Sequence, residues 1–73
     1  MADFKYDITE RIAVLSENNR GWTKELNRVS WNGREPKYDL RDWFHEEGKM
    51  GKGITLTDEE AKNLLEALEG LGL

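Results

Sequence analysis

The sequence has 73 residues and a formal net charge of −4, with one proline, no cysteine and a single histidine. This length is enough for one small domain, which we expect to span residues 1–73. The lack of cysteine excludes disulfides, thiolate metal sites and a cysteine nucleophile, and one histidine cannot form a two-histidine metal motif, so we expect neither a metal nor a cofactor. The longest apolar run, Ile12 to Leu15, is far shorter than the roughly 18 residues that a membrane span needs, and we expect a cytoplasmic protein with no membrane partner.

The first part of the chain predicts two antiparallel strands. From Tyr6 to Leu15 two sets of residues alternate with a period of two and include β-branched members, which predicts a strand. Residues 18–21, Asn-Asn-Arg-Gly, tolerate positive φ and predict a tight turn, and residues 22–31 resume a strand composition. The apolar positions of this second strand change parity between Leu26 and Val29, which indicates a bulge or a bend there.

The middle of the chain predicts two further strands. Asn32-Gly33 is a strong hairpin signal, because both central residues of a type I′ turn need positive φ. Residues 37–44 predict a third strand, one face of which is charged. Residues 45–53 contain three glycines and no periodicity, which predicts a loop, and residues 54–56 predict a short fourth strand.

The last predicted element is a helix over residues 58–69. Thr57 and Glu60 have the spacing of a capping box, and Gly70 is a natural stop. Leu64, Leu65 and Leu68 recur at three- and four-residue steps and give one apolar stripe. The fold class is therefore α+β, with four antiparallel strands followed by one C-terminal helix. One helix covers one face of such a sheet, so the other face must be solvated, paired with a second copy or used for binding.

Charge and aromatic residues are concentrated in the middle of the chain. Residues 20–56 carry a net charge of +2, whereas residues 57–73 carry −4. Binders of single-stranded nucleic acid need cations that neutralise phosphates and exposed rings on which bases stack. Trp22, Trp31 and Phe44 lie among such cations. The alternative interpretation is that the tryptophans form the core or a dimer contact and that the cations form a solvated face.

Nothing in the sequence favours an enzyme or a small-molecule substrate. His45 lies beside Glu46 and Glu47 with no serine or threonine nearby, which indicates an ordinary surface histidine. The glycine-rich segment 48–53 lacks the serine or threonine that follows the lysine of a P-loop. Two interpretations of this segment remain, a phosphate contact and a plain connector.

Two motifs carry a resemblance to a known family. Residues 39–42, Asp-Leu-Arg-Asp, and residues 52–56, Lys-Gly-Ile-Thr-Leu, stand in this order before a capped helix. The chain thereby resembles the transcriptional coactivator positive cofactor four and its small bacterial relatives, most closely the YdbC-like proteins, over residues 22–69. The resemblance implies a curved four-stranded sheet followed by a helix, homodimers formed through the helices, and single-stranded DNA bound on the sheets.

The resemblance also implies roles for individual residues. Arg41 matches a strand arginine that contacts DNA, Phe44 takes the position of a stacking tryptophan, and Lys52 matches the lysine before Gly-Ile. The second hairpin departs from the family pattern. The expected nucleic-acid-binding residues are Trp22, Lys24, Trp31, Arg34, Lys37, Arg41, Phe44, Lys49 and Lys52, and the expected dimer contacts are Leu64, Leu65 and Leu68.

The function that we expect is sequence-independent binding of single-stranded DNA by a homodimer, without enzymatic activity, in transcription, repair or replication. Two alternatives stay open at this point. One is binding of single-stranded RNA, and the other is a protein-interaction module with no affinity for nucleic acid.

Overall fold

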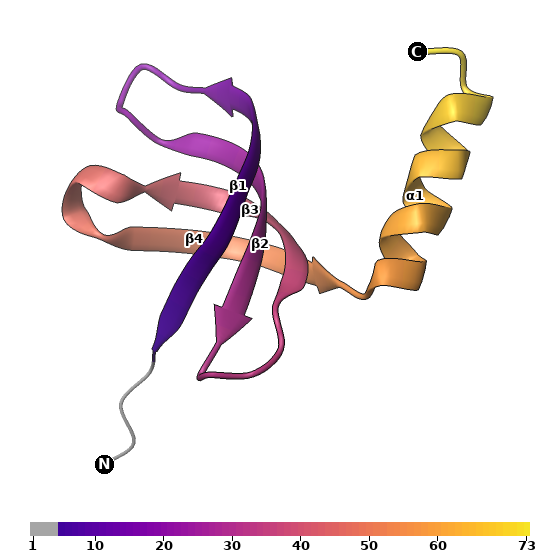
Figure 1. Ribbon diagram of the computed structural model, residues 1–73. Helices are drawn as coiled ribbons and strands as arrows, with labels where there is room; N and C mark the ends of the chain where they lie inside the picture. The colour runs from indigo at the N-terminus through magenta and orange to yellow at the C-terminus, as the bar shows by residue number, and fades with distance from the viewer. Residues whose placement is uncertain (1–4) are drawn as a thin grey trace.

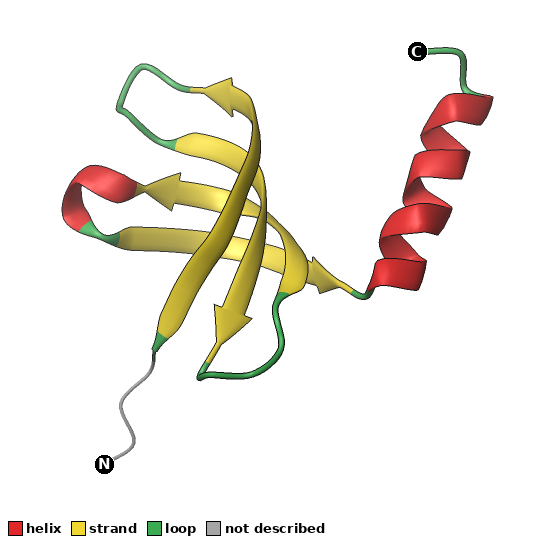
Figure 2. Ribbon diagram, viewed as in Figure 1, coloured by secondary structure: helices red, strands yellow, loops and turns green. Residues whose placement is uncertain are grey.

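The computed structural model describes residues 5–73. Its elements are β1 (Tyr6–Glu17), β2 (Thr23–Trp31), β3 (Lys37–Phe44), the 3-10 turn η1 (His45–Glu47), β4 (Lys49–Leu56) and α1 (Asp58–Gly70). The four strands form one antiparallel sheet in the order β1-β2-β3-β4 (Figures 1 and 2). The predicted fold class is confirmed.

Strand β1 is bulged at regular intervals. It has 12 residues against the 9 of β2, and the pairing of the two strands skips Thr9, Ile12 and Leu15. The pairing of β2 with β3 has no such shift. A bulge or a bend was predicted in the second strand, between Leu26 and Val29, and the bulge is wrong, because the extra residues lie in β1. Leu26 and Val29 lie on opposite faces of a regular strand, and β2 therefore has apolar residues on both of its faces.

The bulges of β1 make the sheet coil, and we call the side that it encloses the concave side. A bulge adds right-handed twist, and β1 crosses the other strands diagonally in Figure 1. The ring of Tyr6 on β1 thereby lies 5.3 Å from the ring of Trp43 on β3, measured between centroids. The apolar core, Val29 and Trp43, lies on this side and is fully buried. The sheet thus buries its concave face with its own first strand, whereas the helix had been expected to provide the covered face.

Strand β4 is longer than predicted. Residues 45–53 were expected to form a loop, but residues 45–47 form η1 and the strand begins at Lys49. Gly48, with φ of 65°, makes the reversal between them. Gly53 lets β3 and β4 approach closely, because a Cβ there would overlap the Cβ of Arg41 and the carbonyl oxygen of Leu40. Of the three glycines that indicated a loop, Gly48 therefore makes a turn, whereas Gly51 and Gly53 lie within β4.

The turn and cap predictions are confirmed. Asn32 and Gly33 have φ of 53° and 75°. The Glu60 N–H donates to Thr57 Oγ1 at 3.1 Å, and the Thr57 N–H donates to Glu60 Oε1 at 2.9 Å. Helix α1 stands to one side of the sheet in Figure 1. Within residues 5–73 no helix is long and apolar enough to cross a bilayer.

Candidate nucleic-acid interface

The sheet has two sides with different chemistry. On what we call the helix side, Lys24, Leu26 and Arg28 of β2 pair with Asp42, Leu40 and Tyr38 of β3. Arg28 also bonds to Asp58 at the start of α1, at 3.1 Å. On the concave side, Glu25 and Asn27 of β2 pair with Arg41 and Asp39 of β3. The expected binding residues are divided between these two sides and the connecting segments.

Arg41 lies on the concave side and is already paired. Its Nε and Nη2 donate to the two carboxylate oxygens of Asp39, at 2.7 and 2.8 Å. The guanidinium lies 4.6 Å from the centroid of the Trp31 ring, and Nη1 lies 3.7 Å from the Met50 sulfur. The Arg41 side chain is 14% exposed and that of Asp39 is fully buried. The first role of Arg41 in this arrangement is to neutralise a buried carboxylate.

Trp31 and Trp43 are both on the concave side and differ in burial. Trp43 belongs to the core, stacked against the ring of His45 at 5.4 Å with an interplanar angle of 8°. Trp31 is half-buried, with its ring 6.0 Å from that of Tyr6 and covered by Arg41. Any base that stacks on Trp31 must share the ring with these neighbours.

A buried polar network lies on the concave side of the sheet. Glu25 is buried and accepts hydrogen bonds from Asn27 at 2.9 Å and from Thr23, while His45 Nε2 lies 2.9 Å from Glu25 Oε2. Burial alone would raise the pKa of Glu25, but these hydrogen bonds and the charge of His45 outweigh it and leave the pKa lowered. His45 is exposed, as expected, and it also ties η1 to the core through Glu25 and Trp43. Within residues 5–73 no cluster of three metal-ligating side chains is present.

Trp22 and Phe44 form a separate aromatic pair. Their rings stack with centroids 5.5 Å apart and an interplanar angle of 22°, and both residues are half-buried. Next to them Lys24 Nζ bonds to Asp42 Oδ1 at 3.1 Å, on the helix side of the sheet. The structure therefore brings three of the expected residues, Trp22, Lys24 and Phe44, into one place.

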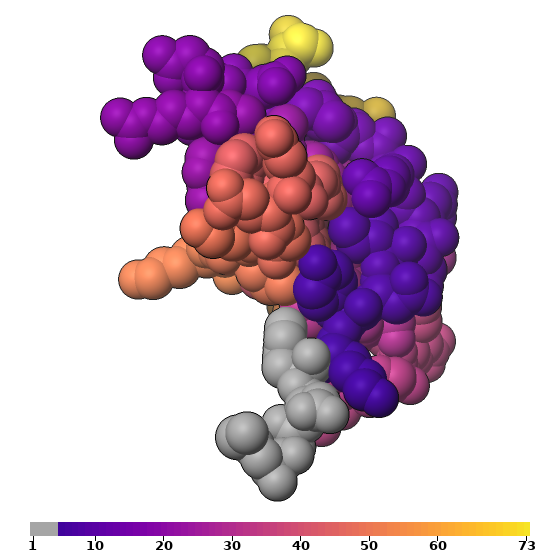
Figure 3. All heavy atoms as spheres, turned by 90° about the vertical axis from the view of Figure 1, so that its left-hand side faces the viewer, coloured from indigo at the N-terminus to yellow at the C-terminus, as the bar shows by residue number. Residues whose placement is uncertain are grey.

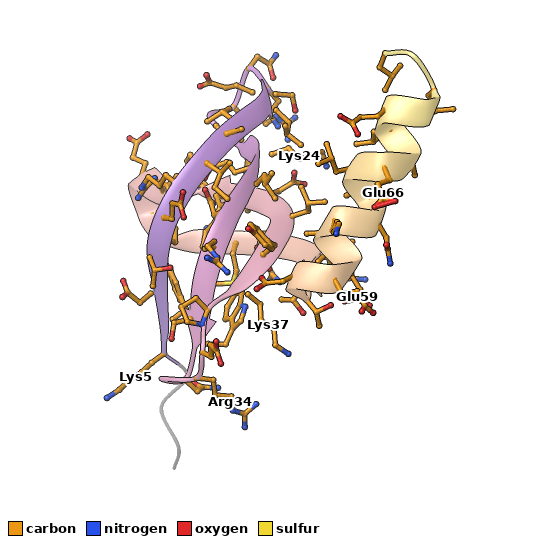
Figure 4. All side chains as sticks on the ribbon, turned by 45° about the vertical axis from the view of Figure 1, so that its right-hand side comes forward. Lys5, Lys24, Arg34, Lys37, Glu59 and Glu66 are labelled. Carbon is orange, nitrogen blue, oxygen red and sulfur yellow. The ribbon has the colours of Figure 1, made fainter. Side chains whose placement is uncertain are left out.

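Further cations lie at both ends of the sheet. In Figure 4 Lys5, Arg34 and Lys37 gather at the end that carries the β2–β3 turn, whereas Lys24 lies further up and toward α1. Lys49 is paired with Glu47 at 3.0 Å. Within residues 5–73 the exposed cations that form no ion pair include Arg20, Arg34, Lys37 and Lys52.

Sequence reasoning missed three residues of this surface, Lys5, Arg20 and Asp42. Lys5 reaches the interface because its backbone exchanges hydrogen bonds with Asn32 across the sheet, at 2.8 and 3.0 Å. Arg20 lies in the turn next to Trp22, a proximity along the chain that could have marked it. Asp42 was noticed only as part of a motif, and its pairing with Lys24 depends on strand register.

The chain is similar to known proteins. A family model described as Transcriptional Coactivator p15 (PC4) matches residues 18–67. A protein of Treponema pallidum (strain Nichols), named as an uncharacterized protein, is 45% identical over 71 residues, which cover 97% of this chain and 84% of that protein. The chain belongs to the PC4 family. Its nine expected binding residues all lie inside the matched segment, whereas β1 lies before it.

This PC4-family chain also has an apolar groove between α1 and the sheet. The groove has a volume of about 380 Å³ and is lined by Leu26, Tyr38, Leu56, Asp58, Ala61, Lys62, Leu64, Leu65 and Leu68. The expected dimer contacts, Leu64, Leu65 and Leu68, line it and are 39%, 55% and 42% exposed. The helix therefore presents its apolar stripe to a groove that the chain itself leaves open.

Proposed function

We propose that this protein binds single-stranded DNA as a homodimer, largely without sequence preference and without an enzymatic step. The observation that carries the proposal is the combination of an aromatic pair, Trp22 and Phe44, with exposed unpaired cations at both ends of the sheet, in a member of the PC4 family. Cations that have no carboxylate partner are free to neutralise phosphates, and a half-buried ring has a face for a base. The cellular compartment that fits this partner is the cytoplasm.

The proposed DNA path begins at the turn that holds Arg20 and Trp22. It continues past the bulge of β4, where Lys52 is exposed, and ends at Arg34 and Lys37. Along this path the chain is cationic although its net charge is −4, because five of its acidic residues lie on α1, including Glu59 and Glu66 in Figure 4. Local potential at the contact, rather than net charge, supports binding of an anion.

The homodimer is proposed from the open groove beside α1. Leu64, Leu65 and Leu68 are each at least 39% exposed. Full burial of a leucine side chain stabilises by about 1.5 to 3 kcal/mol, so covering three of them with a second copy provides a driving force for association. A helix of 13 residues is also marginal alone, and packing against a partner helix stabilises it.

The test is the affinity for a fluorescent oligo-dT of about 20 nucleotides and for a matched duplex, measured at several salt concentrations, since the slope of log K against log salt reports the phosphates neutralised. We expect single-strand preference with a slope of several charges. The Lys52→Ala variant should reduce the slope by about 1.

Two results would overturn the proposal. No salt-dependent binding of any oligonucleotide would indicate a protein-interaction module. Tighter binding of a matched oligo-U would assign the site to RNA, because only contacts to the 2′-hydroxyl favour that sugar. The dimer is tested separately by sedimentation, in which the Leu65→Lys variant should sediment as a monomer.

A further inference from the structure

A hollow lies where the β1–β2 turn meets the beginning of β4. Its volume is about 510 Å³, and it is lined by Ser16, Asn18, Arg20, Trp22, Lys24, Asp42 and Gly51. Figure 3 looks onto this end of the molecule and shows the β1–β2 turn above the β3–β4 connection. The volume lies within the range of small-ligand sites and fits one nucleotide.

The aromatic wall of the hollow is fixed before any ligand arrives. Asn18 Oδ1 accepts hydrogen bonds from the backbone N–H of Arg20 at 2.8 Å and of Trp22 at 3.0 Å. The Trp22 ring is also held by its stack on Phe44. A ring held in this way binds a base without further ordering cost.

The polar wall of the hollow presents a donor next to an acceptor. Lys24 Nζ lies 3.1 Å from Asp42 Oδ1, and the two side chains are 56% and 43% exposed. A carboxylate beside a phosphate-binding surface repels DNA, so it lowers affinity unless a base uses it. Guanine presents one acceptor, O6, beside two adjacent donors, N1–H and N2–H. Thymine presents one N–H between two carbonyl oxygens, which a carboxylate repels.

We propose that this hollow binds one base of the single strand and prefers guanine. The proposal rests on the proposed function, because it assigns selectivity to one position of the same DNA path. The base stacks on Trp22, Asp42 accepts from N1–H and N2–H, and Lys24 donates to O6. Arg20, at the rim, neutralises the adjacent phosphate. The expectation of binding without sequence preference would then fail at this one position.

The experiment compares short oligonucleotides of about ten residues by fluorescence anisotropy. One is all dT, and the others carry a single central dG, dA or deoxyinosine, which lacks the 2-amino group. We expect the dG strand to bind about fivefold more tightly than all-dT, with deoxyinosine in between, since a bidentate contact in an exposed site gives the low end of base discrimination. Equal binding of all four strands would overturn the guanine preference and leave the proposed function standing. No binding of any strand would overturn the proposed function itself.

Two variants test whether Asp42 is responsible for the preference for dG. Asp42→Asn should remove the preference for dG while raising the affinity for all-dT, because it removes a negative charge near phosphates. Glu47→Gln is the matched control, since Glu47 is also an exposed carboxylate paired with a lysine, Lys49, at 3.0 Å. It should change the affinity for all strands alike and leave the dG preference intact. A preference that survives Asp42→Asn, in a variant with an unchanged circular dichroism spectrum, would contradict the assignment.

Discussion

Replacing Arg41 with alanine tests whether this residue holds the fold together. The change leaves the carboxylate of Asp39 fully buried without the two hydrogen bonds that it accepts from Arg41. Removing one partner of a buried ion pair costs about 3 to 5 kcal/mol, and the slight exposure of Arg41 favours the lower value. For a chain of this length a loss of about 3 kcal/mol lowers the melting temperature by at least about 12 °C.

The assay is thermal and denaturant unfolding at one fixed protein concentration, so that a dimer does not shift the midpoint by mass action. Arg34→Ala, which removes an exposed cation, is the matched control and should change stability by at most about 0.5 kcal/mol. Adding Asp39→Asn to Arg41→Ala should recover about 1 kcal/mol or more, because no buried charge is then left unpaired. An Arg41→Ala protein that is as stable as the Arg34→Ala protein would refute this reasoning, and a loss of DNA affinity alone would then assign Arg41 to phosphate binding.

Three further predictions concern stability. Because the pKa of Glu25 is lowered in the folded state, the contribution of Glu25 to folding stability is complete above the unfolded value of 4.5 and is lost as pH falls through the folded value. Unfolding measured down the acid range should show this loss of stability, and the Glu25→Gln variant should show a weaker dependence of stability on pH. Gly53→Ala should destabilise the sheet by more than about 1 kcal/mol through overlap with Arg41, whereas Gly70→Ala, with open space around it, should be neutral or stabilising in the same denaturation assay. Thr57→Ala should cost about 1 kcal/mol and lower the helical circular dichroism signal; an unchanged signal would show that the capping box is dispensable.

The parts of the fold that depend on local chemistry could be predicted from the sequence. The helix begins at Asp58, as predicted, because the capping box is set by residues three apart. It extends to Gly70, one residue beyond the predicted end. The turn at Asn32 and Gly33 was predicted for a similar reason, since positive φ is a property of the single residue.

The parts that depend on strand register could not be predicted in this way. The bulges of β1 depend on how this strand pairs with β2, and no residue type in β1 marks where they occur. The alternation in β3 placed Asp39 and Arg41 on one face, but it did not say that this charged face is the buried one. Only the register shows that Trp31 and Arg41 lie on the opposite side of the sheet from Lys24 and Asp42.

The three bulges of β1 also affect how the sheet meets other chains. β1 is an edge strand of 12 residues, and Ile12, Val14 and Leu15 on it are at least 40% exposed. A straight apolar edge of this length would present a row of unpaired backbone donors and acceptors, with which a strand of another chain could pair. Such pairing is the first step of aggregation. An extra residue inserted at every third position interrupts that row before a second strand can pair with it over its length. We therefore expect the bulges that coil the sheet also to hinder edge-to-edge self-assembly.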